Sequence, residues 1–311
     1  MHVERTILGT IMILWLAGPL LSQEATLAYR LKQGNSYLLD IDIQQNTSSE
    51  SMESEEISMS SHMTLEFRVD SVQPDGAIHA TVDYSDLSLS VLAPELSLDL
   101  NSARGSSRLL SDLIDSIQHA DFHLVMAPSG ELISLTGMSG LFSSLSSYPA
   151  GDPRELEVIL RTLDEAYGYN AFRSIYSLFV AFYPTVQPIK NWTRDVTYYF
   201  NTKPVLMVNR YFLTRTGGEL LVIQGLGMLN SKEGNIENTT WGQVESKVSG
   251  TQTYDYQVDS ATGWLRRCIS RQRVLIETTI LHGTNLPTGL KIPSYTETVF
   301  EVNGTIRPRI N

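Results

Sequence analysis

Residues 170–183 read NAFRSIYSLFVAFY, and Pro184 follows directly. Polar side chains in this stretch are few, chiefly Arg173, Ser174 and Ser177, so apolar groups cover almost the whole circumference of the helix that it predicts. A helix that is apolar nearly all round has to be buried on most of its sides. Proline cannot continue a helix, so we expect this one to end at Tyr183. The rest of the chain must therefore enclose it.

The segments on both sides of this helix have the period-two pattern of half-buried strands. Tyr37, Leu39 and Ile41 alternate with more polar residues, and Pro74-Asp75-Gly76 has the residues of a tight turn. The Ser- and Glu-rich stretch 46–61 is expected to be a solvated hairpin loop. Further strands are expected near residues 63–69, 78–91, 122–126, 132–135, 196–200, 205–214, 220–227, 244–258, 265–280 and 294–302.

Two more helices are predicted in the middle third. Ser106 or Ser107 can cap one, and Asp152-Pro153-Arg154-Glu155 has the residues that begin another. The strands do not alternate one by one with helices, so they predict an antiparallel sheet. We expect an α+β fold: a large, curved, half-barrel-like antiparallel sheet with about three helices packed on its concave face. It forms a single β-rich domain over residues 23–311, with a helical insertion around 106–183.

The N-terminus has the features of a cleavable signal peptide, residues 1–22. A lone Arg5 precedes an apolar run over residues 7–21, and the small residue Ser22 precedes Gln23. The alternative is a membrane anchor, but the run is shorter than the roughly 20 apolar residues that a spanning helix needs, and Pro19 interrupts it. We expect export to a periplasm or the extracellular space, with no transmembrane segment in the mature chain.

The charge and the cysteine content narrow the class of protein. The net charge of −11 disfavours nucleic acid and anionic membrane surfaces as partners, because both would repel the chain. Cys268 is the only cysteine, so no internal disulfide can form. A bacterial envelope protein that relies on a large core fits this better than a disulfide-rich secreted domain.

Residues that could carry chemistry are few. His119, Asp121 and His123 would share one face of a strand and could bind a metal; alternatively His119 ends a helix and the other two lie in a solvated connection. Asp255, Asp259 and Thr262 could bind calcium around a turn, but hairpin-turn chemistry explains them better. No nucleophile elbow or phosphate-binding loop is present. We expect no metal site, no cofactor and no enzymatic activity.

An aromatic set is the candidate ligand site. These side chains either line an apolar pocket or simply fill the core, because aromatic stripes at helical spacing serve both purposes. The candidate ligand-binding residues are Phe172, Tyr176, Phe179, Tyr183 and Trp192.

Several short motifs along the chain resemble a known family. They are Leu31-Lys32-Gln33-Gly34, Pro74-Asp75-Gly76, Tyr183-Pro184 with Trp192 after it, and Asp259 with Thr262-Gly263-Trp264-Leu265. Together they are similar to a family of exported Bacteroidota proteins classified only as a domain of unknown function. The resemblance covers nearly the whole mature chain and implies no activity. At the level of the fold, the chain also resembles periplasmic lipoprotein carriers, whose curved antiparallel sheet wraps helices around an acyl-chain cavity.

These observations lead to a functional expectation with two alternatives. We expect an exported, non-enzymatic envelope protein that binds an apolar ligand or acyl chain, such as a lipid, between the sheet and the helix at residues 170–183. The first alternative is a structural or interaction protein with a solid core and an acidic surface for a protein partner. A hydrolase is the second.

The processing site gives a direct test. We expect the mature N-terminus to be Gln23, because polarity returns immediately after the small residue Ser22. Intact-mass measurement of protein exported by its own host checks this, and the mass also registers a Gln23 that has cyclised. A secreted chain that still begins at Met1 would contradict the prediction.

Overall fold

The computed structural model describes residues 27–49, 56–93, 96–101, 108–118, 120–138, 153–186, 190–200, 203–215, 217–231, 233–239 and 242–309. The predicted signal peptide lies outside these ranges. The described elements, in chain order, are β1 (Ser36–Ser49), β2 (Glu56–Val72), β3 (Ile78–Ala93), β4 (Leu96–Asn101), α1 (Arg108–Gln118), β5 (Phe122–Met126), β6 (Leu132–Thr136), α3 (Pro153–Tyr167), α4 (Tyr169–Phe179), β7 (Asn191–Phe200), β8 (Lys203–Arg215), β9 (Leu220–Asn230), β10 (Asn235–Thr239), β11 (Gly242–Asp259), β12 (Leu265–Gly283) and β13 (Lys291–Arg307).

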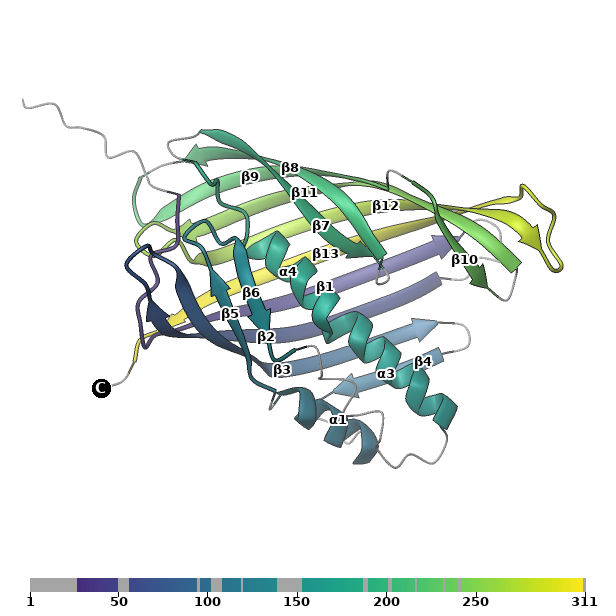
Figure 1. Cartoon of the computed structure of the whole chain (residues 1–311), viewed down its shortest axis with the longest axis horizontal. Coiled ribbons are helices and arrows are strands. Elements are labelled where there is room, and N and C mark those ends of the chain that lie inside the picture. Colours follow the sequence, from purple (N-terminus) through teal and green to yellow (C-terminus); the bar gives the residue numbers. More distant parts are fainter. Residues whose placement is uncertain are drawn as a thin grey trace, which may run out of the picture.

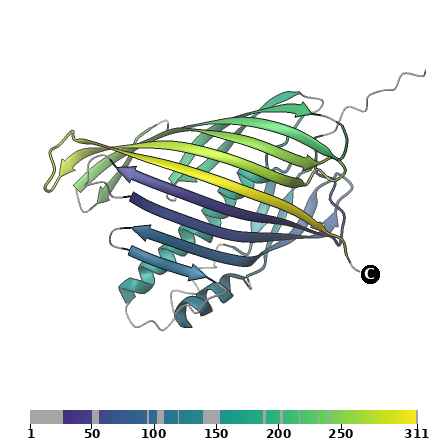
Figure 2. The ribbon, with the colours of Figure 1, turned by 180° about the vertical axis from the view of Figure 1, so that it is seen from behind.

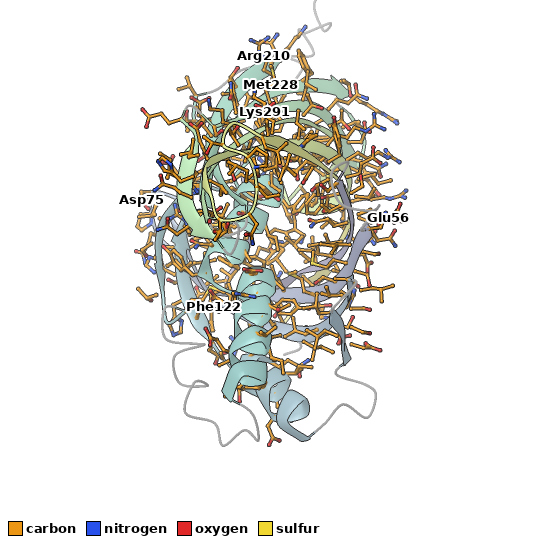
Figure 3. All side chains as sticks on the ribbon, turned by 90° about the vertical axis from the view of Figure 1, so that its right-hand side faces the viewer. Glu56, Asp75, Phe122, Arg210, Met228 and Lys291 are labelled. Atoms are coloured by element: carbon orange, nitrogen blue, oxygen red, sulfur yellow. The ribbon has the colours of Figure 1, made fainter. Side chains whose placement is uncertain are left out.

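The strands form one antiparallel sheet, and its two edge strands, β6 and β7, follow one another in the chain. The order is β6-β5-β3-β2-β1-β13-β12-β11-β9-β8-β7, with β4 paired to β3 and β10 paired to β11. The sheet is open, and it curves around the helices (Figures 1 and 3). From behind, β1 and β13 run side by side through its middle (Figure 2). The α+β class and the curved antiparallel sheet are therefore confirmed.

Alternation along the strands decides which face is buried. In β1, Leu39 and Ile41 are fully buried and lie opposite Leu65 and Met63 of β2. On the outer face, Asp40 and Asp42 are charged, whereas Leu38 is apolar and also buried. Apolar side chains on one face of each strand thus build the core on the concave side, because period two places alternate residues on the same face. β1 and β2 extend further into the Ser- and Glu-rich stretch than expected, since strand pairing continues to Ser48 and Glu56.

Helices α3 and α4 lie end to end, separated by Gly168 alone (Figure 1). The Gly168 N–H donates to the Asp164 carbonyl at 2.8 Å, and a Cβ at Gly168 would clash with Asp164. We call α3 and α4 together the rod. The described helices α1, α3 and α4 therefore form two helical bodies, the rod and α1, so the expectation of about three helices is slightly off. None of the helices in the described part of the chain is long and apolar enough to span a membrane.

Helix α4 ends earlier than predicted, at Phe179 instead of Tyr183. The N–H groups of Val180 and Ala181 both donate to the Tyr176 carbonyl, at 2.8 and 3.0 Å, so the helical hydrogen-bond ladder closes there. Residues up to Tyr183 remain buried although they are no longer helical. The apolar pattern therefore predicted burial correctly but extended the helix too far.

Buried side chains satisfy carbonyl groups at the junction of α3 and α4 and at, or just beyond, the C-terminal end of the rod. The last carbonyls of a helix have no partner within the helix, and water cannot reach them here. Each of the donors comes from the strands or from the segment before β1. The bonds run from Tyr84 to Tyr167 O (2.9 Å), from Tyr256 to Leu178 O (2.7 Å), from Tyr29 to Val180 O (2.9 Å), from Trp192 Nε1 to Phe182 O (2.6 Å) and from Arg194 to Tyr183 O (2.9 Å).

The turn between β11 and β12 locks the end of this buried segment. Asp259 accepts hydrogen bonds from the Thr262 N–H and hydroxyl, both at 2.8 Å, which confirms the turn role of these two residues. Burial of the carboxyl opposes ionisation, but the bonds from Thr262 and Arg266 outweigh it and lower the pKa of Asp259. The Gly263 carbonyl in this turn accepts the Tyr183 hydroxyl at 2.7 Å. The turn is thereby fixed to the chain that follows α4.

The donors at the end of α4 can be tested singly. Tyr256→Phe removes the hydroxyl bonded to Leu178 O and leaves a buried carbonyl without that partner, which we expect to cost about 1–3 kcal/mol of unfolding free energy. Chemical denaturation of wild type and variant measures the loss. The matched control is Tyr295→Phe, at a position that is 43% exposed, and it should change stability little. Equal stability of the two variants would show that the bond contributes nothing.

Candidate functional site

A cavity of about 200 Å³ lies between the rod and the concave face of the sheet. The apolar part of the lining, here called the apolar wall, consists of Ile43, Met59 and Phe300 from the sheet and Ile175 and Leu178 from α4. From α4 the lining includes Ala171, Ser174, Ile175 and Leu178, a spacing that places them on one face of the helix. Because the first two are small, they fill little of the space in front of this face.

The polar groups that we call the polar wall are Gln45, Thr298 and Tyr198, from β1, β13 and β7. The other polar residues of the lining are Ser61, Thr162, Glu165, Ser174 and Tyr199. Thr298 donates to the Gln45 side-chain oxygen at 3.4 Å. Burial raises the pKa of Tyr198 to about 12, although a hydrogen bond with Gln272 opposes this rise. The cavity thus combines an apolar wall with uncharged hydrogen-bonding groups.

Glu165 is the one charged side chain among the described residues that line the cavity. Burial of its carboxyl raises the pKa of Glu165, Arg161 opposes that rise, and Asp164 adds to it. Arg161 and Asp164 are themselves outside the lining. The cavity therefore offers no cation to an incoming anion.

A row of polar side chains continues from the cavity across the concave face. Gln45 pairs with Thr298, Thr298 with Gln272, and Gln272 with Gln252, while Asn209 lies one strand further, beyond Gly227. We call these five side chains the polar row. They lie in register on five strands, so the row crosses the floor of the curved sheet between apolar positions.

The polar row is buried and internally bonded. Gln252 and Asn209 are 0% exposed and Gln272 is 2% exposed. The Gln272 amide donates to the Gln252 oxygen at 2.9 Å, and the Gln252 amide donates to Ser270 at 2.7 Å. Asn209 accepts the Tyr254 hydroxyl at 3.0 Å, but its Nδ2 has no partner among the described residues. Buried polar groups normally find partners, so this interior is specialised rather than a uniform apolar core.

Glycine makes the inner end of the row possible. Gly227 lies between Gln252 and Asn209 on β9, and a Cβ there would lie 2.5 Å from the Asn209 side-chain oxygen and 3.2 Å from the Tyr254 hydroxyl. Any larger residue would push these groups apart. The absence of a side chain at this position therefore keeps Asn209 against Tyr254.

The five residues predicted as ligand contacts lie in the core, adjacent to the cavity. None of them lines it, because they occupy a neighbouring face of α4 or the chain beyond it. Phe172 packs edge-on against Phe122, with ring centroids 4.8 Å apart, and Phe179 packs against Phe300 at 5.6 Å. As direct ligand contacts the set stays a prediction. The side chains concerned are Phe172, Tyr176, Phe179, Tyr183 and Trp192, all at most 7% exposed.

Sequence reasoning missed the polar row, although a signal was present. Gln252 follows the same parity as the inward-facing Tyr254 and Tyr256, and Gln45 continues the parity of Ile43. Polar residues in an inward register are unusual and mark a functional or structural exception. Period-two parity alone could have found them. Parity could not have shown that these residues align into one row, because the alignment depends on the register between strands that are distant in the sequence.

The residues of the predicted metal alternative do not form a described cluster. His119 lies outside the described residues. Asp121 bonds to Arg68 at 2.8 Å, and the ring of His123 lies 3.0 Å from the Thr81 hydroxyl. These two side chains are therefore engaged by separate partners.

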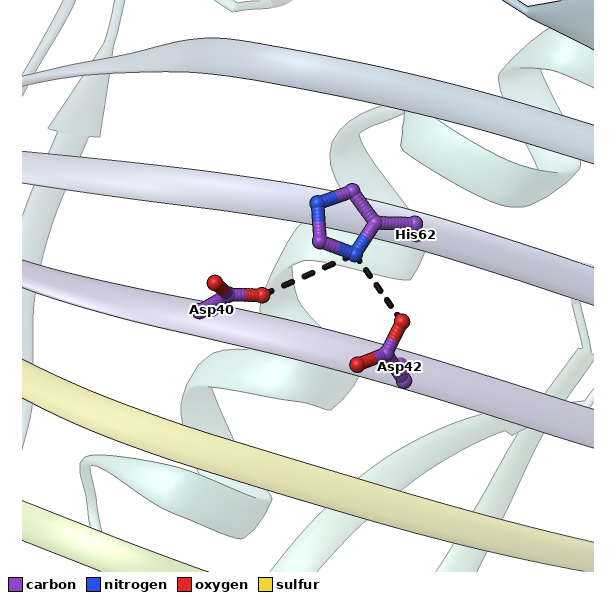
Figure 4. Close-up of side chains that lie close together, drawn as sticks. All are labelled: Asp40, Asp42 and His62. Atoms are coloured by element: carbon purple, nitrogen blue, oxygen red, sulfur yellow. Dashed lines mark hydrogen bonds and ion pairs between the residues drawn. The ribbon is translucent and has the colours of Figure 1, made fainter.

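A different charged group lies on the outer face of the sheet. His62 Nδ1 is 2.9 Å from Asp42 and 3.5 Å from Asp40 (Figure 4). One side-chain nitrogen or oxygen from each of the three residues lies within 4.8 Å of the others. Asp86 approaches the other ring nitrogen at 3.8 Å. The carboxylates are exposed, and the hydrogen bond between His62 Nδ1 and Asp42 accounts for the arrangement.

Comparison with known proteins adds a fold relationship. No curated protein sequence matches the chain. Lipovitellin, in a structure concerned with its lipid–protein interactions, is similar at 11% identity and a TM-score of 0.51; the match covers 90% of this chain and 26% of lipovitellin. The chain thus spans about a quarter of that protein, and the likeness shows the fold alone. The outer membrane protein OprG from Pseudomonas aeruginosa matches at 7% identity over 89% of this chain and 97% of OprG, with a TM-score of 0.24 that carries no argument.

Family membership rests on the sequence. The model of DUF6263, a family of unknown function, matches residues 75–265, from the turn after β2 to the start of β12. The resemblance to a family of unknown function is confirmed at this level. Because the match spans more than half of the chain, the protein belongs to the DUF6263 family.

Proposed function

We propose that the protein is an exported, non-enzymatic envelope protein, of the bacterial type that the sequence motifs resemble, and that it binds an apolar ligand or acyl chain between the rod and the sheet. The observation that carries the proposal is the cavity with its wall of Ile43, Met59, Ile175, Leu178 and Phe300. An apolar cleft with a few polar groups is the common form of a small-molecule site.

The size and position of the cavity limit what it binds. Ligand pockets commonly measure about 300–1,000 Å³, and this one is smaller, at about 200 Å³. It therefore suits a single chain or the end of one, not a bulky multi-chain lipid. The fold likeness to lipovitellin, whose structure concerns lipid–protein interactions, supports a lipid as the ligand class.

A specific observation favours a second candidate function, a structural or interaction protein. The aromatic side chains around α4 are packed as tightly as a core, and Phe172 and Phe179 are 0% exposed. The net charge of −11 would then serve a basic protein partner. This candidate requires no ligand, so ligand binding by the purified protein separates the two.

The cavity can be filled from α4. Ala171→Leu places a larger side chain on the cavity-lining face of the helix, and we expect it to weaken binding of the uncharged apolar dye N-phenyl-1-naphthylamine about tenfold or more, because the space is occupied. Fluorescence titration measures the affinity. Glu157→Leu, exposed on α3 and outside the cavity lining, is the control. A wild type that does not bind the dye would refute ligand binding and leave the structural candidate.

Phe179→Ala tests the packing behind Phe300, a residue of the apolar wall. The ring is fully buried, so its loss should cost about 3–5 kcal/mol of unfolding free energy. Because Phe179 backs Phe300, which lines the cavity, we also expect a changed affinity for the dye. Chemical denaturation and dye titration give both values, with Phe212→Ala, 46% exposed, as the control. Destabilisation without any change in dye affinity would show that Phe179 is core only.

A further inference from the structure

The polar wall of the cavity, together with the proposed function, defines a ligand class. Gln45, Thr298 and Tyr198 bring amide and hydroxyl groups, which donate and accept hydrogen bonds but carry no charge. The Thr298–Gln45 bond is long at 3.4 Å, whereas hydroxyl-to-oxygen bonds are usually near 2.7–2.8 Å. A polar ligand group can therefore replace it with little loss.

The charges around the cavity disfavour an anionic group. Glu165 is the charged residue among the described lining; although burial raises its pKa, its ionised form would repel a second carboxylate or a phosphate. Burying an anion without a cation or a set of donors is costly. Arg173 contacts the Tyr199 hydroxyl at 3.3 Å, and its guanidinium lies over the Tyr169 and Tyr199 rings, but it is not part of the lining.

The polar row extends this neutral environment inward. Gln272 lies next to Thr298 in the pairing of β12 with β13 and donates to Gln252 beyond it, so the row continues from the polar wall. The row ends at the Asn209 amide, whose Nδ2 has no partner among the described residues. Each side chain of the row is an amide or a hydroxyl, so no charge enters along its length.

We propose that the cavity binds a neutral amphiphile: an alkyl chain against the apolar wall, and a hydroxyl- or ester-bearing head group on Gln45, Thr298 and Tyr198. This inference rests on the proposed function and narrows its ligand to uncharged lipids of the monoacylglycerol class. Free fatty acids and phosphate-bearing lipids are disfavoured by Glu165 and by the missing cation.

Competition between ligands of one chain length tests the head group. Bound N-phenyl-1-naphthylamine is displaced from the full-length mature protein at pH 8 by 1-decanoylglycerol, by decanoate or by decyltrimethylammonium, each below its micelle concentration. We expect decanoylglycerol to displace the dye at a concentration about tenfold below that of decanoate. Equal or better displacement by decanoate or by the cation would overturn the neutral head group.

Two substitutions locate the head group. Thr298→Val removes one hydroxyl with little change of shape and should weaken decanoylglycerol about fivefold, the effect of one lost hydrogen bond. The control is Thr296→Val, the same change at the next inward position of β13, where the hydroxyl bonds to Thr47 outside the cavity. Glu165→Gln should strengthen decanoate and leave decanoylglycerol unchanged.

The outcomes separate this inference from the proposed function. If the wild type does not bind the dye, the proposed ligand binding is refuted before any head group is compared. If the dye binds but Thr298→Val and Thr296→Val have the same affinity for decanoylglycerol, the cavity binds alkyl chains and the polar wall does not contact the head group. If Glu165→Gln leaves decanoate unchanged, the carboxylate does not select against anions. Either of the last two results overturns this inference and leaves the proposed function standing.

Discussion

The structure depends on satisfying the backbone carbonyl groups where the rod ends inside the protein. A helix that ends in an apolar interior leaves acceptors that water cannot reach, and each unpaired one costs free energy. Here hydroxyl, indole and guanidinium donors reach these acceptors, among them Tyr256 of β11 at Leu178 and Tyr29, from the segment before β1, at Val180. The donors on strands are fixed by strand register, so they also fix the position of the end of α4 over the concave face. These bonds hold the C-terminal end of the rod over the concave face, and the cavity lies beside α4 between the rod and the sheet.

The connectivity explains why a rod is needed at all. The two edge strands of the sheet, β6 and β7, are consecutive strands in the chain, so their connection must cross from one edge to the other. Helices α3 and α4 make that crossing over the concave face (Figure 1). Contacts at β7 tie the crossing to the edge: the Tyr199 N–H donates to the Ser174 hydroxyl at 2.9 Å. An unpaired edge amide is thereby given a partner from α4.

Much of this fold could be predicted from the sequence because it depends on local periodicity. The alternation of Leu39 and Ile41 and the turn at Pro74-Asp75-Gly76 identified strands, and the apolar stretch around Phe179 identified a buried helix. The short strands β4 and β10 were missed, since each gains its stability from a neighbouring strand rather than from its own pattern. The end of α4 was misplaced because tertiary donors, not residue type, close it. The candidate site was predicted only as a location near α4, because the alignment of Gln45 with Thr298 and Gln272 requires pairing between strands far apart in sequence.

The pairing of β1 with β13 sets the order in which this molecule can assemble. Ser36 pairs with Arg307 and Ser49 with Ser294, so the central seam joins opposite ends of the folded chain. β13 lies between β1 and β12, and the two meanders become one sheet only when it is inserted. Contacts this distant slow folding, because the entropy of closing a long loop is lost before the pairing is gained. A ribosome or translocon that has released the chain only as far as β12 holds two half-sheets with open edges at β1 and β12. Those edges are templates for association with other chains, so the period before the last strand arrives is the stage most exposed to aggregation.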